Sequence, residues 1–273
     1  MLSLCLLCAC TKKTEAPYQY KGDTAMWNHT FAVSEPFLMP KKMPAGIIIP
    51  HHDICTFEQN SFYKALSQYG CPSVVVLLSP DHFERGEKAI SLPTQTNFLS
   101  PEGTIPLAKN IINALKKDSS LAPSVSFESE LWKEEHGIFA HTPFIHHYFP
   151  KARLLPVALK PCATNEDFIA FKNFATFLAN NLPQDALIVA SVDFSHYQIP
   201  RMTELHDKVS LNTIANMESP RDLEVDSPES LFTLMEFCTL RKKTVPILLH
   251  RTCTYDKIPD ENIESTSHQY WTF

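Results

Sequence analysis

Three times along this chain, a short apolar run is followed at once by proline or an acid and then by histidine. The three segments are Ile47–Asp53, Val74–His82 and Ala186–His196. Continuous apolar runs of this length are typical of strands buried on both faces of a parallel sheet. In open α/β sheets, ligands bind at the carboxyl ends of such strands. The chain is therefore predicted to form a sheet that brings polar side chains to one edge.

Segments with helical patterns separate these runs, Phe57–Tyr69 after the first and Asp167–Asn181 before the third. Two parallel strands joined by a helix form a right-handed unit, so their carboxyl ends point the same way. His51 and His82 are therefore predicted to converge. Further strands are predicted at 89–92, 153–159, 245–250 and 267–273, and further helices at 106–117, 134–148, 203–217 and 228–240.

The alternation of strands and helices predicts an α/β fold: a single-domain, three-layer α/β/α arrangement with a mostly parallel sheet. Within it, Pro156 indicates an edge position or a bulge, because proline has no N–H to donate. The segment 267–273 is expected to be a last, partly edge strand. We see no internal repeat and no charged linker between residues 40 and 273.

Glycine is scarce, with six residues, and proline abundant, with 21. No glycine-rich phosphate loop, dinucleotide fingerprint or Gly-x-Ser-x-Gly elbow is present, which disfavours nucleotide-binding and serine-hydrolase functions. The net charge is −6 and the basic residues are scattered. The sequence therefore gives no indication of nucleic-acid binding.

The N-terminus differs from the rest of the chain. Leu7-Cys8-Ala9-Cys10 ends a short apolar run and resembles a bacterial lipobox, whose final cysteine is lipidated. We predict a signal and tether segment over 1–35, an α/β domain over 36–273, and export with membrane contact only through a lipid anchor at Cys10. No Lys or Arg precedes the apolar run, which leaves a cytoplasmic protein with a disordered tail as the alternative.

Five further cysteines lie in the body of the chain: Cys55, Cys71, Cys162, Cys238 and Cys253. Their wide spacing contains no Cys-x-x-Cys pair, which disfavours a structural zinc site of that type. Export would permit one disulfide, but the spacing does not say which. Most of these thiols are expected to be small buried apolar groups.

Two imidazoles and one carboxylate form the facial triad that binds non-haem Fe(II), and zinc uses a chemically similar set. His51 and His82 are the predicted imidazoles, with His52 as the alternative to His51. Four carboxylates lie near strand or helix ends: Asp53, Asp81, Asp193 and Asp226. The predicted helix 134–148 carries four histidines, which we interpret as structural or solvated, except for His136 at its start.

The order Pro50-His51, Ser79–His82, Glu135-His136 and Asp193–Tyr197 resembles the Memo family, over about residues 45–273. The resemblance implies the fold of class III extradiol dioxygenases. Those enzymes hold Fe(II) with two histidines and a glutamate and use another histidine as acid and base. Memo-family proteins usually carry a cysteine, within a Cys-Gly pair, where the glutamate would be.

This chain has no Cys-Gly pair, and the resemblance places Asp226-Ser227-Pro228 at that point. It implies His51, His82 and Asp226 as metal ligands, with Cys238 as the rival third ligand if it is not a core thiol. His196 is the implied general acid and base. Asp193 would orient His196 or a neighbouring ligand, or else cap a following helix, and His136 would line the cleft.

We therefore expect a non-haem metal site that binds Fe(II), with copper or zinc as alternatives. The expected function is a metal-dependent, dioxygenase-like oxidoreductase that acts on a small chelating substrate. The alternative is a non-catalytic protein that binds a peptide or a metal on the same scaffold, because Phe139 and Ala140 stand where the family has a glutamate after His136. A metal-dependent hydrolase is a third reading.

Overall fold

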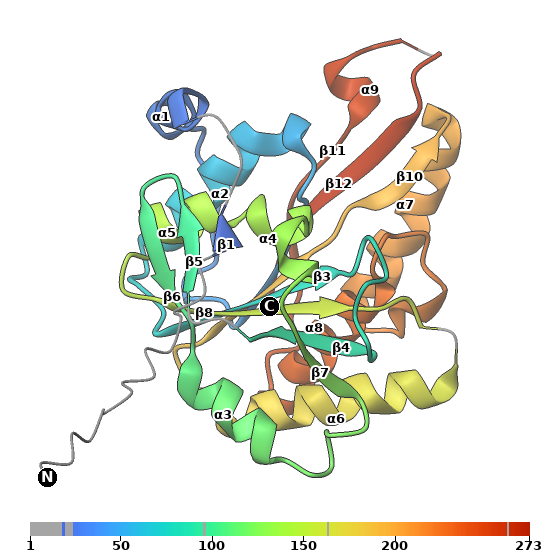
Figure 1. The fold of residues 1–273 in the computed structure, drawn as a ribbon. Coiled ribbons are helices and arrows are strands. Elements are labelled where there is room, and N and C mark those ends of the chain that lie inside the picture. Colours follow the sequence, from blue (N-terminus) through green and yellow to red (C-terminus); the bar gives the residue numbers. More distant parts are fainter. Residues whose placement is uncertain (1–17, 20–23, 95–96, 163, 261) are drawn as a thin grey trace, which may run out of the picture.

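The computed structural model describes residues 18–19, 24–94, 97–162, 164–260 and 262–273. Its main sheet follows the order β10-β12-β2-β9-β3-β8-β4-β7, with β11 added beside β12 (Figure 1). In that order the strands are Phe194–Gln198, Ser265–Thr272, Gly46–Ile49, Leu187–Ser191, Val74–Pro80, Arg153–Leu159, Ile90–Pro93 and Val125–Glu128, and β11 is Ile247–Cys253.

The centre of the sheet is parallel. Strands β2, β9, β3 and β8 pair in parallel, with Ile49 opposite Ser191 and Leu78 opposite Ala190. All residues of β2, β9 and β3 are buried, as their uninterrupted apolar character requires. Because the strands are aligned in this register, their carboxyl ends meet at one edge, where the polar segments begin.

Helices cover both faces of the sheet. Helices α6 (Asn165–Asn181) and α8 (Pro228–Leu240) lie on one face, and α2 (Thr56–Ser67), α4 (His136–Phe139) and α5 (Thr142–Tyr148) lie on the other (Figure 1). Helix α8 approaches β2 closely, since a Cβ at Gly46 would lie 2.4 Å from Leu234 Cδ1 and 2.9 Å from Cys238 Sγ. The predicted α/β class with a mostly parallel, helix-flanked sheet is confirmed.

The remaining elements lie around this framework. The second sheet has the order β1-β5-β6. Its strands are Tyr18–Gln19, Asn97–Ser100 and Gly103–Pro106. The other described α-helices are α1 (Thr24–Ala32), α3 (Lys109–Lys117), α7 (Pro200–Ala215) and α9 (Thr254–Lys257). Short 3-10 turns span Asp53–Cys55, Leu131–Lys133 and Pro220–Asp222.

The single helix predicted over 134–148 is wrong. The segment forms α4 and α5, which are separated at Ala140 and His141. Pro143 explains the break, because a proline inside a helix removes one hydrogen bond and its ring clashes with the preceding turn. Here Pro143 lies in the first turn of α5, where a missing N–H has no cost.

The edge position predicted for 267–273 is wrong, whereas Pro156 does lie where one side of its strand has no partner among the described strands. Strand β12 pairs with β11 on one side and with β2 and β10 on the other, and all its residues are buried. Pro156 lies within the sheet, paired with β3 at Leu77. On its other side, β8 pairs with described residues at Leu154 and at Ala158–Leu159, so the missing N–H of Pro156 falls between these contacts.

Ordered structure begins earlier than the predicted boundary at residue 36. Helix α1 lies inside the predicted tether, and its Trp27 is 3% exposed and contacts the edge of Phe144 at a centroid distance of 5.0 Å. The lipobox and Cys10 lie outside the described residues, so lipidation stays a prediction. Among the described residues, no helix has both the length and the apolar character needed to cross a bilayer.

No two of the five described cysteines form a disulfide with each other. Cys55, Cys238 and Cys253 are buried, as expected of small apolar groups, whereas Cys71 is exposed. Burial raises the pKa of the Cys238 thiol, which keeps it protonated in the core.

Candidate metal centre

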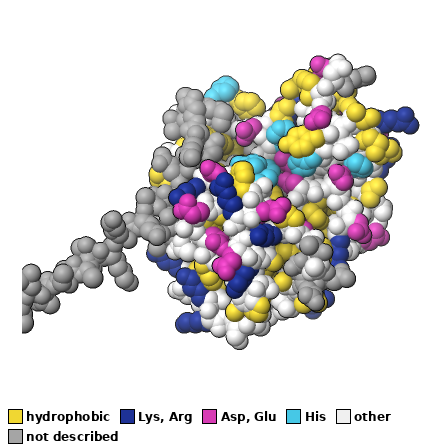
Figure 2. Space-filling model, turned by 45° about the vertical axis from the view of Figure 1, so that its right-hand side comes forward, with side chains coloured by type: hydrophobic (Ala, Val, Ile, Leu, Met, Phe, Trp, Pro, Cys, Tyr) yellow, Lys and Arg dark blue, Asp and Glu magenta, His cyan; other side chains and the backbone are white. Residues whose placement is uncertain are grey.

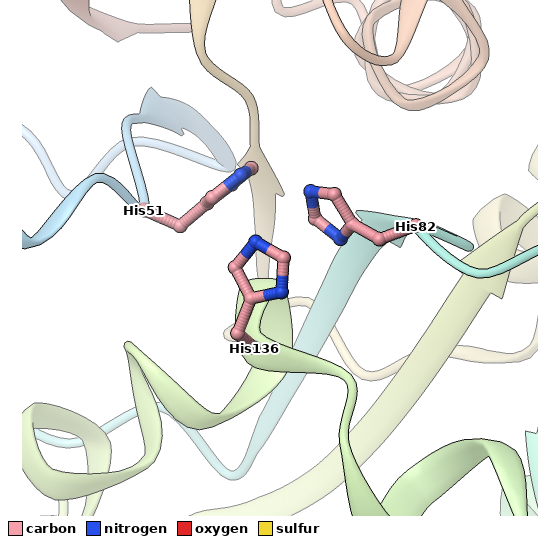
Figure 3. Close-up of side chains that lie close together, drawn as sticks. All are labelled: His51, His82 and His136. Atoms are coloured by element: carbon pink, nitrogen blue, oxygen red, sulfur yellow. The ribbon is translucent and has the colours of Figure 1, made fainter.

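Three histidines converge at the carboxyl edge of the parallel strands. His51 follows β2, His82 follows β3 and His136 begins α4, and their rings point toward one another (Figure 3). The ring centroids of His82 and His136 lie 3.8 Å apart, and that of His51 lies 4.9 Å from His82 and 5.5 Å from His136. The predicted convergence of His51 and His82 is therefore present, and His136 joins them.

Ser191, at the end of β9, determines the tautomer of His51. Its hydroxyl donates to the Gly137 carbonyl at 2.8 Å, which uses its only hydrogen. His51 Nδ1 lies 2.9 Å and His141 Nε2 3.1 Å from the same oxygen, so both imidazoles must donate to it. His51 is thus protonated at Nδ1, and its Nε2 faces the cluster, where it becomes a metal ligand once it carries no proton.

Two carboxylates face His51 Nε2. Asp226 Oδ2 lies 3.1 Å and Asp193 Oδ2 3.6 Å from that nitrogen. Asp226 Oδ2 is buried and has no partner in hydrogen-bonding geometry among the described residues. Burial acts to lower the pKa of His51, but Asp193 and Asp226 outweigh it and raise the pKa to about 9. The site therefore attracts a cation, either a proton or a metal ion.

Both carboxylates are also held by the backbone. Asp193 Oδ1 accepts from the His51 amide at 3.1 Å, and Asp226 Oδ1 accepts from the Asp193 amide at 3.2 Å. Asp193 thus lies beside His51, which is one of the predicted metal ligands. Strand β10, and not a helix, follows Asp193, so Asp193 does not cap a helix. These bonds leave the second oxygen of each carboxylate directed at the imidazole.

Glu135 fixes the orientation of His82. The carboxylate is fully buried, and its Oε1 lies 2.6 Å from His82 Nδ1 while its Oε2 accepts from the His82 amide at 3.0 Å. A carboxylate bound to Nδ1 leaves Nε2 as the free ring nitrogen. Glu135 also caps α4 by accepting from the Gly137 amide. A larger residue at Gly137 would displace Ser79, because its Cβ would overlap Ser79 Oγ.

Two groups of described residues have ligand atoms close enough to share a metal ion. One contains His51, His82 and His136, and the other contains His51, Asp193 and Asp226. His51 belongs to both, and the predicted set of His51, His82 and Asp226 is divided between them. Burial and the neighbouring His82 and His51 lower the pKa of His136 to about 4. His136 is therefore neutral at pH 7, which is the form of histidine that binds metals.

The other predicted residues have different surroundings. His196 is half-buried and lines the cavity next to the cluster. His52 also lines the cavity, but its Nδ1 lies 2.9 Å from His268 Nε2 and it belongs to neither metal group. Asp81 is buried and accepts from the amides of Arg85 and Gly86, so it stabilises a turn. Cys238 lies in the core against β2 and belongs to neither metal group.

A cavity of about 720 Å³ opens beside the cluster. Figure 2 shows histidine side chains gathered on this face, with acidic and hydrophobic side chains around them. The cavity residues are Trp27, His51, His52, Asp53, Thr56, Gln59, His82, His136, Phe139, Ala140, Asp193, His196, Tyr197, Glu224, Val225, Asp226 and Thr266. A small molecule that enters it would meet the imidazoles and both carboxylates.

Sequence reasoning missed Glu135, Ser191 and His141 as parts of the site. Glu135 precedes His136 and was noted only as part of a motif. Ser191 is the last residue of a buried apolar strand, and a hydroxyl at the carboxyl end of such a strand is the sequence signal that it contacts the site. His141 was interpreted as one of several structural histidines, and it is fully buried with its Nε2 on Ser191.

Two buried histidines predict loss of stability in acid. Burial lowers the pKa of His141 and of His268 well below the usual value of about 6.5. The unfolded chain binds protons below that value and the folded chain does not. The stabilisation is thus present above pH 6.5 and is lost as pH falls, by up to about 1.4 kcal/mol per pH unit for each histidine.

Urea unfolding between pH 7.5 and 5.5 checks this prediction. His141→Gln should have a shallower dependence of unfolding free energy on pH than the unchanged protein. His147→Gln is the control, because His147 is partly exposed and paired with Glu102. Equal slopes for His141→Gln and the unchanged protein would contradict the prediction.

Comparisons with known proteins agree with this architecture. The family model for Memo-like proteins matches residues 19–230. A MEMO1 family protein of Methanothermobacter thermautotrophicus is 23% identical over 176 residues, covering 63% of this chain and 61% of that protein. A MEMO1 family protein of Thermococcus onnurineus is 29% identical over 164 residues, covering 58% of this chain and 54% of that protein. The match thus spans less than two thirds of the length of these relatives.

A crystal structure shares the fold. An uncharacterized protein of Escherichia coli K12, JW3007, superimposes with a TM-score of 0.51 and 13% identity, covering 84% of this chain and 99% of that chain. At this identity the likeness concerns the fold alone.

Proposed function

The chain belongs to the Memo-like protein family, and from this premise we propose that it binds a divalent metal through His51, His82 and Asp226. The observation that carries the proposal is the position of Asp226 Oδ2. This buried oxygen lies 3.1 Å from His51 Nε2 and has no second partner among the described residues. The carboxylate and the imidazole nitrogen hold a cation between them, which is a proton in the metal-free protein and would be a metal ion in the loaded one.

The donor atoms favour Fe(II). Two imidazoles and one carboxylate match the facial set of non-haem iron proteins, whereas zinc and copper are the chemically related alternatives. His136 and Asp193 are the neighbouring donors that either metal group would add. When bound, Fe(II) would supply Lewis-acid and redox chemistry toward a small chelating substrate and dioxygen, as in a dioxygenase-like oxidoreductase.

The residues of the chain have separate roles in this proposal. Glu135 and Ser191 hold the rings of His82 and His51 by their Nδ1 atoms, which leaves each Nε2 for the metal. His196, half-buried at the cavity, accepts a proton from the substrate at a ring nitrogen and later returns it. The apolar ring of Phe139 limits the water around the ligand.

One observation favours a second candidate, a non-catalytic binding protein. Phe139 and Ala140 line the cavity at the end of α4, where a polar group would assist in chemistry. In this case the same site would hold a metal or a peptide without turnover.

Metal analysis of protein purified with and without oxygen tests the proposal. We expect about one iron per chain in protein prepared anaerobically, and no stoichiometric metal in the His51→Ala/Asp226→Ala double variant. Asp222→Asn, an exposed acid outside the cavity, is the control. If the unchanged protein held no more iron, copper or zinc than the double variant, the proposal would be refuted. If it holds metal, oxygen uptake with catechols distinguishes an enzyme from a binding protein.

A further inference from the structure

We propose that this cavity selects a positively charged ligand, a small metal-chelating aromatic molecule that bears a protonated amine. The inference rests on the proposed metal function and specifies its substrate class. It is carried by the charges that line the cavity, by their partners, and by the aromatic ring at the rim.

The described residues that line the cavity are acids, histidines and uncharged residues, and His51, whose pKa is raised, is paired with Asp193 and Asp226. Asp53, Asp193, Glu224 and Asp226 contribute carboxylates, and none of the lining residues is Lys or Arg. An anionic substrate would therefore meet no fixed positive side chain, whereas substrate carboxylates and phosphates are usually bound by Arg or Lys.

A bound divalent ion does not cancel this charge. The carboxylates of Asp193 and Asp226 face His51 and would together balance the two positive charges of the metal. Asp53 and Glu224 remain, and both are exposed. Neither forms an ion pair with a described residue, and neither Arg85 nor Lys257 lines the cavity. These two cations are paired with Glu134 and Glu58. The rim thus keeps a net negative charge.

The rim also presents an aromatic ring suited to a cation. Tyr197 lines the cavity, is 70% exposed, and has a backbone φ of 52°. A bulky residue rarely adopts this left-handed conformation, and such strain persists where the surrounding structure maintains it. The face of a tyrosine ring attracts an ammonium group. The ring and the two free carboxylates therefore favour the same kind of ligand.

Three catechols that differ only in the charge at the end of a two-carbon chain test the inference. They are dopamine (positive), 4-ethylcatechol (neutral) and 3-(3,4-dihydroxyphenyl)propionate (negative). Calorimetric titration of Zn(II)-loaded protein avoids oxidation of the catechols. We expect dopamine to bind about tenfold or more tightly than the propionate, with 4-ethylcatechol between them, and the ratio to shrink between 50 and 500 mM NaCl.

Variants assign the effect to the rim. Asp53→Asn/Glu224→Gln should reduce the dopamine-to-propionate ratio to within about threefold, whereas the control Asp222→Asn should keep it. Equal binding of the three catechols, binding of none of them, or an unchanged ratio in the double variant would overturn the inference.

The two proposals fail separately. Metal content is measured for each protein before titration, so a chain without metal refutes the proposed function. The three ligands are titrated into metal-free protein as well, where the rim carboxylates still act, and a missing charge preference there and in the loaded protein overturns this inference alone.

Discussion

Replacing Asp226 with cysteine is expected to shift the metal preference of the protein from Fe(II) toward Zn(II) and Cu(I). The carboxylate is a hard oxygen donor, and a thiolate at the same place is a soft donor that favours these ions. We expect the ratio of zinc to iron affinity to rise by about tenfold or more, which corresponds to ~1.4 kcal/mol. Loading metal-free protein with equimolar mixtures and measuring the bound metals checks this outcome.

Two further variants show whether the effect of Asp226→Cys comes from a change of metal ligand. Asp226→Asn keeps the shape but removes the charge, so it should weaken all divalent metals without changing their order. His136→Gln tests the competing group of three histidines. If Asp226→Cys left the zinc-to-iron ratio unchanged and His136→Gln removed the metal, His136 rather than Asp226 would be the third ligand.

Replacing Glu135 with glutamine is expected to weaken metal binding by about 10–100-fold. The carboxylate is fully buried and bonded to His82 through Nδ1 and through the backbone amide. A neutral amide lowers the electron density on the His82 ring, so its Nε2 becomes a weaker metal ligand. The amide can also present an N–H to His82 where a hydrogen-bond acceptor is needed. Competition with a chelator of known affinity measures the loss.

Glu134→Gln is the matched control for this change. Glu134 precedes Glu135 in the chain, but it is about half exposed and pairs with Arg85 on the surface. Its replacement should leave metal affinity unchanged and alter unfolding free energy by less than about 1 kcal/mol. Glu135→Ala should instead destabilise the fold by about 3–5 kcal/mol, because several buried donors lose their acceptor. Equal metal affinity in the two glutamine variants would show that Glu135 does not orient His82.

The sequence was sufficient to predict how the central strands bring His51 and His82 together. Apolar runs buried on both faces, joined by helices, leave few arrangements, and parallel pairing aligns their carboxyl ends. The structure has this register, with Ile49 opposite Ser191. The prediction succeeded because it depended on local patterns and on the handedness of crossovers.

Other features depend on contacts that no local pattern contains. Strand β12 pairs with both β2 and β11 because of tertiary packing. Its position as the last strand in the sequence does not show this, so the edge position predicted for 267–273 is wrong. The contact of Glu135 with His82 joins residues 53 positions apart. The break before α5 was predictable, since Pro143 lies inside the segment that was interpreted as one helix.

The position of β2 has a consequence for how the protein is made. This strand precedes His51 in the chain, yet its two neighbours, β9 and β12, are synthesised much later, and Phe273 accepts a hydrogen bond from Ala45. Pairing between distant segments closes long loops and is slow. A growing chain on the ribosome therefore carries His51 without the sheet that positions it, and the cluster that would retain a metal assembles only after β9 and β12 have been synthesised.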